Sequence, residues 1–335
     1  MEPLRIVAIG GGTGLSSVLH GLKRYAKEPR EVEITAIATV TDDGGSSGRL
    51  RREFDVLPPG DIRNCMVALS EDDALLSRLF QYRFSDGRGL KGHSFGNLFL
   101  TALTNLTGDF VGAVKQSSEV LASLGRIYPS TAANVVLEAE LENGRIVKGE
   151  TRIGKSRSPI RQIRIRPKGC KPLPEALAAI QEADLITLGP GSLFTSVIPN
   201  VLVKGIPEAI RRSRALKAYF VNLMSQPGET TGFRASDHVA AIHRHAGMPL
   251  LDIAVVNTRP ISPRQRRKYA AEQARPVIND IDRLAEMELQ VMATDLLSEG
   301  ATVRHDRRAT AEVAMELARR GRTARRRVPI LARAE

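Results

Sequence analysis

The chain has 335 residues, 42% hydrophobic and 26% charged, which is typical of a globular protein with one large domain or two modest ones. With no tryptophan, only 4% aromatic residues and no long apolar run, it is unsuited to a base-stacking platform or to membrane insertion. Its net charge of +12 fits phosphate-bearing ligands as well as nucleic acid.

Two further features bear on location. Cys65 and Cys170 are the two cysteines, and they give neither a disulfide framework nor the spacing of zinc ligands. The N-terminus enters an apolar run directly, without the pattern of a signal peptide. We therefore expect a cytoplasmic protein.

The first predicted unit is a strand, a glycine loop and a helix. Leu4–Ile9 is an apolar strand, Gly10–Gly14 is the loop, and apolar residues recur at helical spacing from Leu15 to Tyr25. Such a loop lets backbone N–H groups at a helix start approach a phosphate. A plain tight turn without a ligand would have the same sequence pattern. The predicted ligand contacts here are Gly11, Gly12, Thr13, Gly14 and Leu15.

Two carboxylates, Asp42 and Asp43, follow the second predicted strand, Ile34–Val40. An acid at this place binds ribose hydroxyls in dinucleotide-binding units, whereas a turn cap is the alternative because Asp-Gly favours turns. Asp61 ends a Pro-Pro-Gly turn and is the expected N-cap of the next helix. These three carboxylates are also the candidate metal ligands.

The segment GHSFGN at 92–97 opens a predicted helix over Leu98–Leu106. It contributes the candidates His93, Ser94 and Asn97, and Asn64 in the first turn of the preceding helix could also reach a ligand. A purely structural role explains a histidine here equally well. No Ser–His–Asp arrangement indicates a nucleophile.

A β-rich segment interrupts the alternation of strands and helices at about 133–168. Val135–Leu141 and Ile146–Ile153 both alternate apolar and polar residues around Asn143-Gly144, which predicts a hairpin. Ile160–Ile165 also alternates, which predicts a third strand. We interpret this segment as an insert.

The α/β alternation then resumes. Asp184–Leu188 is a buried strand, and it ends in a second candidate phosphate loop at Gly189, Pro190, Gly191 and Ser192. Ala218–Leu223, which carries the candidate Asn222, leads into a polar loop, and Ile253–Val256 is the last central strand. The prediction is one Rossmann-like α/β domain over 1–315, a doubly wound and mostly parallel sheet, with a basic tail at 316–335.

Six segments carry a family resemblance that runs from about residue 4 to about residue 306. AIGGGTGLSS, VTDDGGSSGRLRREF, LPPGDIRNC, GHSFGNL, LGPGSLFTS and NLMSQPGET resemble the gluconeogenesis-factor family, the YvcK-like proteins. That family is related to CofD, the 2-phospho-L-lactate transferase that acts on a deazaflavin.

The resemblance implies a protein that binds UDP-sugars, UDP-N-acetylglucosamine in particular, with no established reaction and no required cofactor. It implies a regulatory role in gluconeogenic carbon metabolism, cell-wall precursor balance and cell shape. Arg304, in Arg304-His305-Asp306, matches the arginine tied to UDP-sugar binding, whereas Arg307 stands where a phosphorylatable threonine can occur. Regulatory protein partners and a homo-oligomer, a dimer, are expected, with Mg²⁺ as a candidate ion.

Three other functions are considered. A phospholactate-type transferase would need a metal at Asp42, Asp43 or Asp61 to neutralise its diphosphate leaving group. An NAD(P)-dependent oxidoreductase would share the fold, but the sequence shows no identifiable acid–base pair that would lie beside a nicotinamide. Nucleic-acid binding rests on the net charge alone and is not expected.

Overall fold

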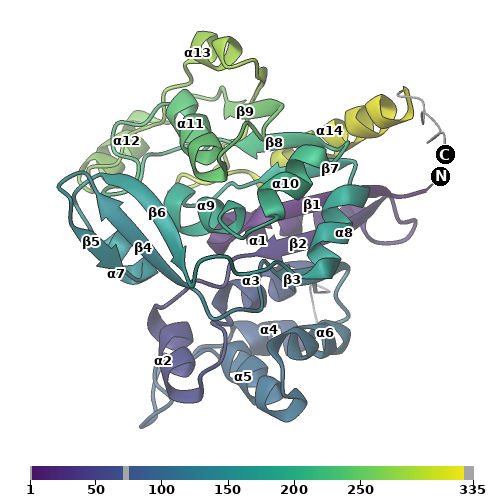
Figure 1. The fold of residues 1–335 in the computed structure, drawn as a ribbon, viewed down its shortest axis with the longest axis vertical. Coiled ribbons are helices and arrows are strands. Elements are labelled where there is room, and N and C mark those ends of the chain that lie inside the picture. The colour runs from purple at the N-terminus through teal and green to yellow at the C-terminus, as the bar shows by residue number, and fades with distance from the viewer. Residues whose placement is uncertain (1, 71–74, 328–335) are drawn as a thin grey trace.

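The computed structural model describes residues 2–70 and 75–327. Its main sheet has seven parallel strands in the order β10-β9-β8-β7-β1-β2-β3 (Figure 1). The strands are β1 (Leu4–Gly10), β2 (Val32–Ala38), β3 (Gly125–Pro129), β7 (Leu185–Leu188), β8 (Leu216–Phe220), β9 (Ile253–Asn257) and β10 (Gln290–Thr294). The predicted α/β class and parallel sheet are confirmed.

The order in which the chain adds strands to the sheet reverses at β1. From β1 the chain moves outward through β2 to β3, and later returns to place β7 against the other side of β1, where Ile6 is level with Leu185. In open α/β sheets, ligands bind at such a reversal, beyond the carboxyl ends of the strands. The two glycine loops follow β1 and β7, so they flank this point.

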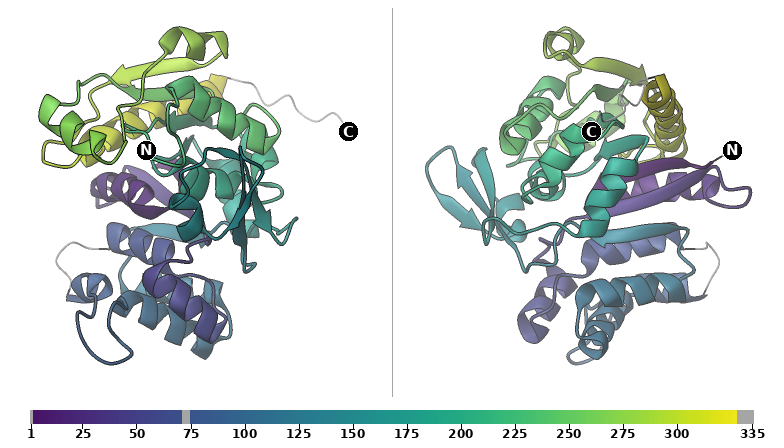
Figure 2. Two further views of the ribbon diagram at one scale, coloured as in Figure 1. Left: turned by 90° about the vertical axis from the view of Figure 1, so that its left-hand side faces the viewer. Right: turned by 45° about the vertical axis from the view of Figure 1, so that its right-hand side comes forward.

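Helices cover both faces of the sheet. One layer contains α1 (Gly12–Leu22), which continues as a 3₁₀ turn over Lys23–Tyr25, with α3 (Gly60–Leu69) and α14 (Arg307–Arg327). The other contains α8 (Pro174–Glu182), α9 (Ile198–Val201), α10 (Ile206–Arg212) and α11 (Ala235–Ala246) (Figure 2). The remaining helices are α2 (Gly45–Phe54), α4 (Leu75–Gln81), α5 (Phe95–Thr107), α6 (Phe110–Val120), α7 (Glu150–Gly154), α12 (Pro263–Ala270) and α13 (Ile281–Glu286).

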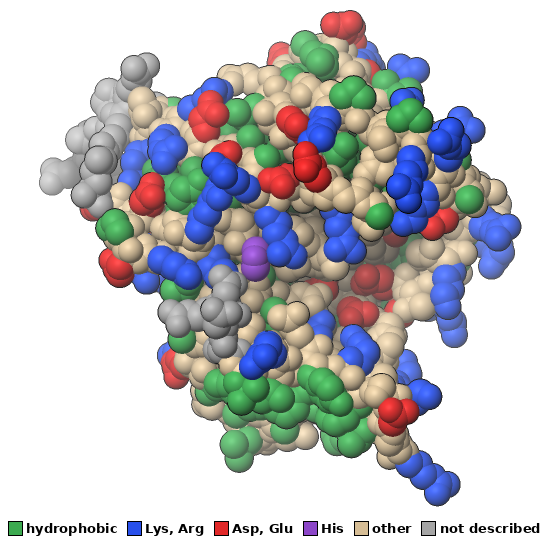
Figure 3. All heavy atoms as spheres, turned by 180° about the vertical axis from the view of Figure 1, so that it is seen from behind, with side chains coloured by type: hydrophobic (Ala, Val, Ile, Leu, Met, Phe, Trp, Pro, Cys, Tyr) green, Lys and Arg blue, Asp and Glu red, His purple; other side chains and the backbone are tan. Residues whose placement is uncertain are grey.

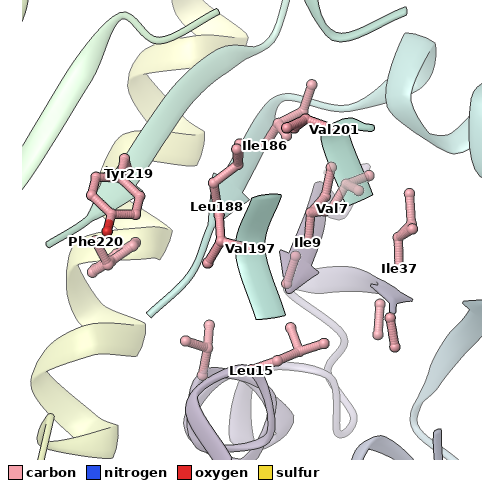
Figure 4. Packing of buried hydrophobic residues seen from close by; sticks show 14 of the residues in the cluster. Val7, Ile9, Leu15, Ile37, Ile186, Leu188, Val197, Val201, Tyr219 and Phe220 are labelled. Atoms are coloured by element: carbon pink, nitrogen blue, oxygen red, sulfur yellow. The ribbon is translucent and has the colours of Figure 1, made fainter. Parts of the chain in front are cut away.

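The core forms where the central strands meet these helices. β1, β2 and β7 are apolar on both faces and almost wholly buried, as strands covered by two helical layers must be. Figure 4 shows Leu15 of α1 packing below Ile9 and Val197, with Leu188 and Ile186 of β7 alongside. The Leu15 side chain therefore belongs to the core and does not line the cavity described below.

The insert is a separate small sheet in the order β5-β4-β6, with β4 (Val136–Leu141), β5 (Ile146–Lys148) and β6 (Ile160–Arg166) all antiparallel. The predicted hairpin is present, but its second strand ends at Lys148. The prediction that this strand continues to Ile153 is wrong, because Gly149 adopts a positive φ of 92° and α7 begins at Glu150. This break turns Glu150 toward the main sheet.

The predicted basic tail needs correction. Residues 316–327 continue α14, which lies along β1, β7 and β8 with Met315 and Leu317 buried (Figure 2). Gly321 packs so closely on β7 that a Cβ there would lie 2.0 Å from the carbonyl oxygen of Asp184. The apolar stripe of this helix was obscured by its arginines. Residues 328–335 of the predicted tail lie outside the described residues.

Two outer strands, β3 and β10, were not predicted. β3 reads GRIYP and β10 reads QVMAT, so neither has the long apolar run that marks a central strand. Both lie at the edges of the sheet, where one side is left without a neighbouring strand.

The lower end of the molecule exposes apolar side chains. Figure 3 shows them gathered where α4–α6 lie, and Leu75, Tyr82 and Leu106 there are 62%, 50% and 81% exposed. Within the described ranges, no single helix is long and apolar enough to cross a membrane. The bent helix pair Leu193–Val201 and Ile206–Arg212 has the length and apolar composition of a membrane span only when both parts are taken together.

Candidate nucleotide-binding site

A cavity of about 360 Å³ opens at the carboxyl ends of β1, β7 and β8. Half of the predicted ligand residues meet in its wall, although they come from segments spread over almost the whole chain. They are Gly11, Gly12, Thr13, Gly14, Pro190, Gly191, Ser192, Asn222 and Arg304.

The two glycine loops touch each other at the cavity wall. A Cβ on Gly14 would lie 2.0 Å from the carbonyl oxygen of Pro190, and one on Gly191 would lie 3.5 Å from the carbonyl oxygen of Gly11. Only hydrogen at Gly14 permits this approach of two backbones. The loops therefore form one continuous backbone surface that no side chain shields.

Each loop also leads into a helix. α1 begins at Gly12 with no side-chain hydrogen bond capping its N-terminus, so its first N–H groups can face a phosphate. The second loop enters a π-helical turn over Leu193–Val197, in which the N–H groups of Ser196 and Val197 both donate to the carbonyl of Ser192. π-helical turns occur frequently at functional sites.

Side chains hold the second loop in place. The backbone N–H of Gly191 donates to Asn222 Oδ1 at 3.3 Å, and Gln226 Nε2 donates to Ser192 Oγ at 2.7 Å. Asn222 and Gln226 lie in the loop after β8, so this loop holds the glycine loop after β7 in position. Gly189 lies behind this surface and does not line the cavity, contrary to its prediction.

Arg304 supplies a positive charge at the rim. It is exposed and makes no ion pair with a described residue. Its neighbour His305 is partly buried, and its Nε2 lies 3.1 Å from the carbonyl oxygen of Val221, which anchors the segment to the end of β8. Burial lowers the pKa of His305 to about 4, so the ring is neutral and donates this bond at physiological pH.

The acids after β2 do not line this cavity. Asp42 accepts the N–H of Gly44 at 2.9 Å, as an Asx turn does. Asp43 accepts the N–H and the hydroxyl of Thr151 at 2.8 and 2.6 Å, and so ties the insert to the main sheet. The geometry supports the turn interpretation for Asp42, whereas Asp43 pairs with the insert.

Asp61 is buried beside the first glycine loop. It lies in the first turn of α3 behind the N-cap position, which is Pro59, so the prediction that it is the cap is wrong. A Cβ on Gly11 would lie 2.6 Å from Asp61 Oδ2, and the N–H of Gly12 donates to the carboxyl. Burial and the nearby Asp42 carboxylate raise the pKa of Asp61 to about 7.

The remaining candidates form a buried network next to the cavity. His93 Nδ1 lies 3.1 Å from Ser46 Oγ, and Asn97 Nδ2 donates to Ser47 Oγ at 3.3 Å. Arg63 donates to Ser94 Oγ at 2.9 Å and to Asn64 Oδ1 at 2.5 Å. Neither His93, Ser94, Asn97 nor Asn64 lines the cavity, so their predicted contacts with a ligand there are not supported.

Sequence reasoning missed Glu150, which the insert places in the cavity wall. Its Oε2 accepts the hydroxyl of Thr41 at 3.1 Å, and burial together with the Asp61 and Asp42 carboxylates raises its pKa well above the ordinary value. No motif marks this residue, because its segment reads as a strand. The other lining residues that were missed are Ser17, Ser196, Leu223, Met224, Gln226, Val303 and His305.

A divalent metal, which the transferase hypothesis needs, does not fit the side chains as they stand. Among residues 2–70 and 75–327, no group of three or more His, Cys, Asp or Glu side chains could hold a metal ion. Asp43 Oδ1 already accepts both the N–H and the hydroxyl of Thr151. Asp42, Asp43 and Asp61 therefore do not form a ready metal site.

Comparison with known proteins decides the family. The family model described as 2-phospho-L-lactate transferase CofD matches residues 6–297. The chain belongs to the CofD family. Within that family it resembles the gluconeogenesis factor of Halalkalibacterium halodurans, with 47% identity over 94% of this chain and 97% of the relative. The gluconeogenesis factor of Bacillus subtilis is also 47% identical, over 93% of this chain and 98% of the relative.

A solved structure supports the same CofD-family fold. The crystal structure of a Bacillus halodurans protein superposes with a TM-score of 0.90 at 46% identity, covering 94% of this chain and 100% of that one. The resemblance to gluconeogenesis factors noted from the six sequence motifs is thereby confirmed. This chain is a gluconeogenesis-factor-type member of the CofD family.

The buried Asp61 leads to a testable pH dependence. Because its pKa rises from 3.8 to about 7 on folding, the folded chain binds more protons than the unfolded chain between these values. The contribution of Asp61 to stability is therefore full below about pH 4 and is lost as the pH rises through about 7. Asn at position 61 can still accept the Gly12 N–H. At pH 8 the free energy of unfolding of Asp61→Asn should exceed that of wild type by about 2–4 kcal/mol, whereas at pH 4 the two values should be nearly equal.

Urea unfolding at pH 4, 6 and 8 would measure this difference. Asp282→Asn, an exposed change on α13, is the control and should show no such trend. A difference between Asp61→Asn and wild type that stays constant from pH 4 to 8 would contradict the prediction.

Proposed function

We propose that the chain is a cytoplasmic regulatory protein of gluconeogenic carbon metabolism that binds a nucleotide sugar, UDP-N-acetylglucosamine, in the cavity at the switch point. The observation that carries the proposal is the cavity wall, in which two bare glycine loops face the rim arginine Arg304. Backbone N–H groups at a helix start and an unpaired guanidinium suit the two charges of a diphosphate.

The rest of the wall suits the remainder of such a ligand. Leu223, Met224 and Val303 offer apolar contact for a base or sugar face, whereas Ser17, Ser196 and Gln226 offer polar groups for hydroxyls. A cavity of about 360 Å³ is within the range of small-molecule sites. The names of the relatives, gluconeogenesis factors, support the metabolic role.

Calorimetric titration with UDP-N-acetylglucosamine, with and without Mg²⁺, tests the proposal. Wild type should bind, and Arg304→Glu should weaken binding at least about tenfold, since a charge-assisted contact contributes roughly 1.5–3 kcal/mol. Arg266→Glu, the same charge reversal on exposed α12, should bind like wild type. UDP-glucose, GDP, NADH and a deazaflavin serve as comparison ligands.

Equal binding by the Arg304→Glu and Arg266→Glu proteins would contradict the proposed site. No heat with either UDP-sugar, together with Mg²⁺-dependent binding of GDP or the deazaflavin, would instead favour the second candidate. That candidate is a phospholactate-type transferase, and the matching family model is what favours it. The side-chain arrangement offers it no ready metal site.

Assembly and cellular role belong to the same proposal. The exposed apolar side chains of α4 and α5, Leu75, Leu76 and Leu106 among them, offer a surface that a second copy or a regulatory protein could cover. A protein of this kind would adjust the supply of cell-wall precursors, and hence cell shape, to the nucleotide-sugar level. Light scattering of the purified protein would test the expected dimer.

A further inference from the structure

A second cavity, of about 320 Å³, lies at the far end of α1 from the glycine loop. One wall is the end of α1 and the turn after it, with His20, Arg24 and Lys27, and the other is the first turn of α14, with Arg307 and Arg308. None of these residues lines the proposed nucleotide-sugar cavity.

The cavity gathers more positive charge than its surroundings neutralise. Glu312 on α14 already pairs with Arg308 at 2.8 Å and with Arg24 at 3.3 Å, and the Asp306 carboxylate also attracts Arg308. Lys27 and Arg307 are exposed and form no ion pair with any residue in the described ranges. Arg24, Lys27, Arg307 and Arg308 therefore outnumber these two carboxylates, and their like charges repel one another.

Two features of the backbone hold the cations together. Gly21 packs against α14 so closely that a Cβ there would lie 2.1 Å from the carbonyl oxygen of Arg307. Arg307 and Arg308 also stand in the first turn of a 21-residue helix, where the helix dipole disfavours positive charge. An anion bound between the two helices would relieve both the repulsion and the unfavourable placement.

We infer that this cavity is a second, separate binding site for a small phosphorylated metabolite. Arginine and lysine side chains on two walls can donate to several phosphate oxygens at once. The concave shape and modest volume suit a small molecule better than the long, evenly charged backbone of a nucleic acid. The inference stands whether or not the first cavity binds a nucleotide sugar.

Pyrophosphate is the probe, titrated calorimetrically into four proteins at low ionic strength. They are wild type, Lys27→Ala/Arg307→Ala, the control Arg266→Ala/Arg267→Ala on exposed α12, and Arg304→Ala at the other cavity. The two double variants remove the same net charge, so general attraction of anions falls equally in both. The Lys27→Ala/Arg307→Ala protein should bind the probe at least tenfold more weakly than the α12 control.

The Arg304→Ala protein shows which cavity the probe occupies. Binding of the probe that is retained by the Arg304→Ala protein and lost by the Lys27→Ala/Arg307→Ala protein supports a second site. Equal affinities for the two double variants would overturn the inference. Because Lys27 and Arg307 are exposed, unfolding is not expected, and a matching thermal transition for both double variants would verify this.

Discussion

Replacing Arg322 with alanine should lower the free energy of unfolding by about 3–5 kcal/mol, because it leaves a buried carboxylate without its main partner. Arg322 reaches from α14 to Asp184 at the start of β7, with Nε and Nη2 at 3.1 and 2.5 Å from Oδ2. The two side chains are only 18% and 4% exposed. Arg322 also donates to the backbone carbonyls of Glu2 and Pro3, both at 2.5 Å.

Chemical denaturation at neutral pH would measure this loss. Arg320→Ala is the matched control, since Arg320 pairs with Glu316 on the same helix but both side chains are about half exposed; such surface pairs contribute up to about 1 kcal/mol. If the Arg322→Ala and Arg320→Ala proteins unfold at the same denaturant concentration, the buried pair does not hold the helix as described.

Replacing Gly14 with valine should be the most damaging single change in the glycine loops. A Cβ at Gly14 would lie 2.0 Å from the Pro190 carbonyl oxygen and 2.9 Å from the Gly191 Cα, both backbone atoms that cannot turn aside. The loops must separate, so we expect a loss of about 3 kcal/mol in stability and no binding of any ligand that spans both loops.

Gly10→Ala is the control for this prediction. Its Cβ would meet nothing closer than 3.5 Å, an ordinary van der Waals distance, so stability should change by less than about 1 kcal/mol. Thermal unfolding and the UDP-N-acetylglucosamine titration would be run on both proteins. A Gly14→Val protein as stable as the Gly10→Ala protein would show that the loops do not touch as described.

The central fold could be predicted because its signals are local. β1, β2 and β7 read as short apolar runs, and each ends in a loop of small polar residues, so the sheet edge and two of its loops were recognisable from the sequence. Arg304 came only from the resemblance to a family, because a single exposed arginine carries no local signal.

The rest depended on contacts between distant segments. Asp43 looked like a ligand residue because its partner, Thr151, lies 108 positions later and nothing nearby in the chain indicates the pairing. Glu150 was missed because a break at Gly149 ends the strand and redirects the chain. α14 was taken for a tail because its arginines dominate its composition, although one of them is an internal anchor.

The anchoring of α14 has a consequence during synthesis. Arg322 binds the carbonyl of Pro3, just before β1, across 319 positions of the chain. While the ribosome is still making the second half, the residues of β1 and α1 have already been synthesised but lack the helix that covers them, so their apolar side chains stay open to water or to a chaperone. Completion of the domain therefore waits for α14 to leave the exit tunnel.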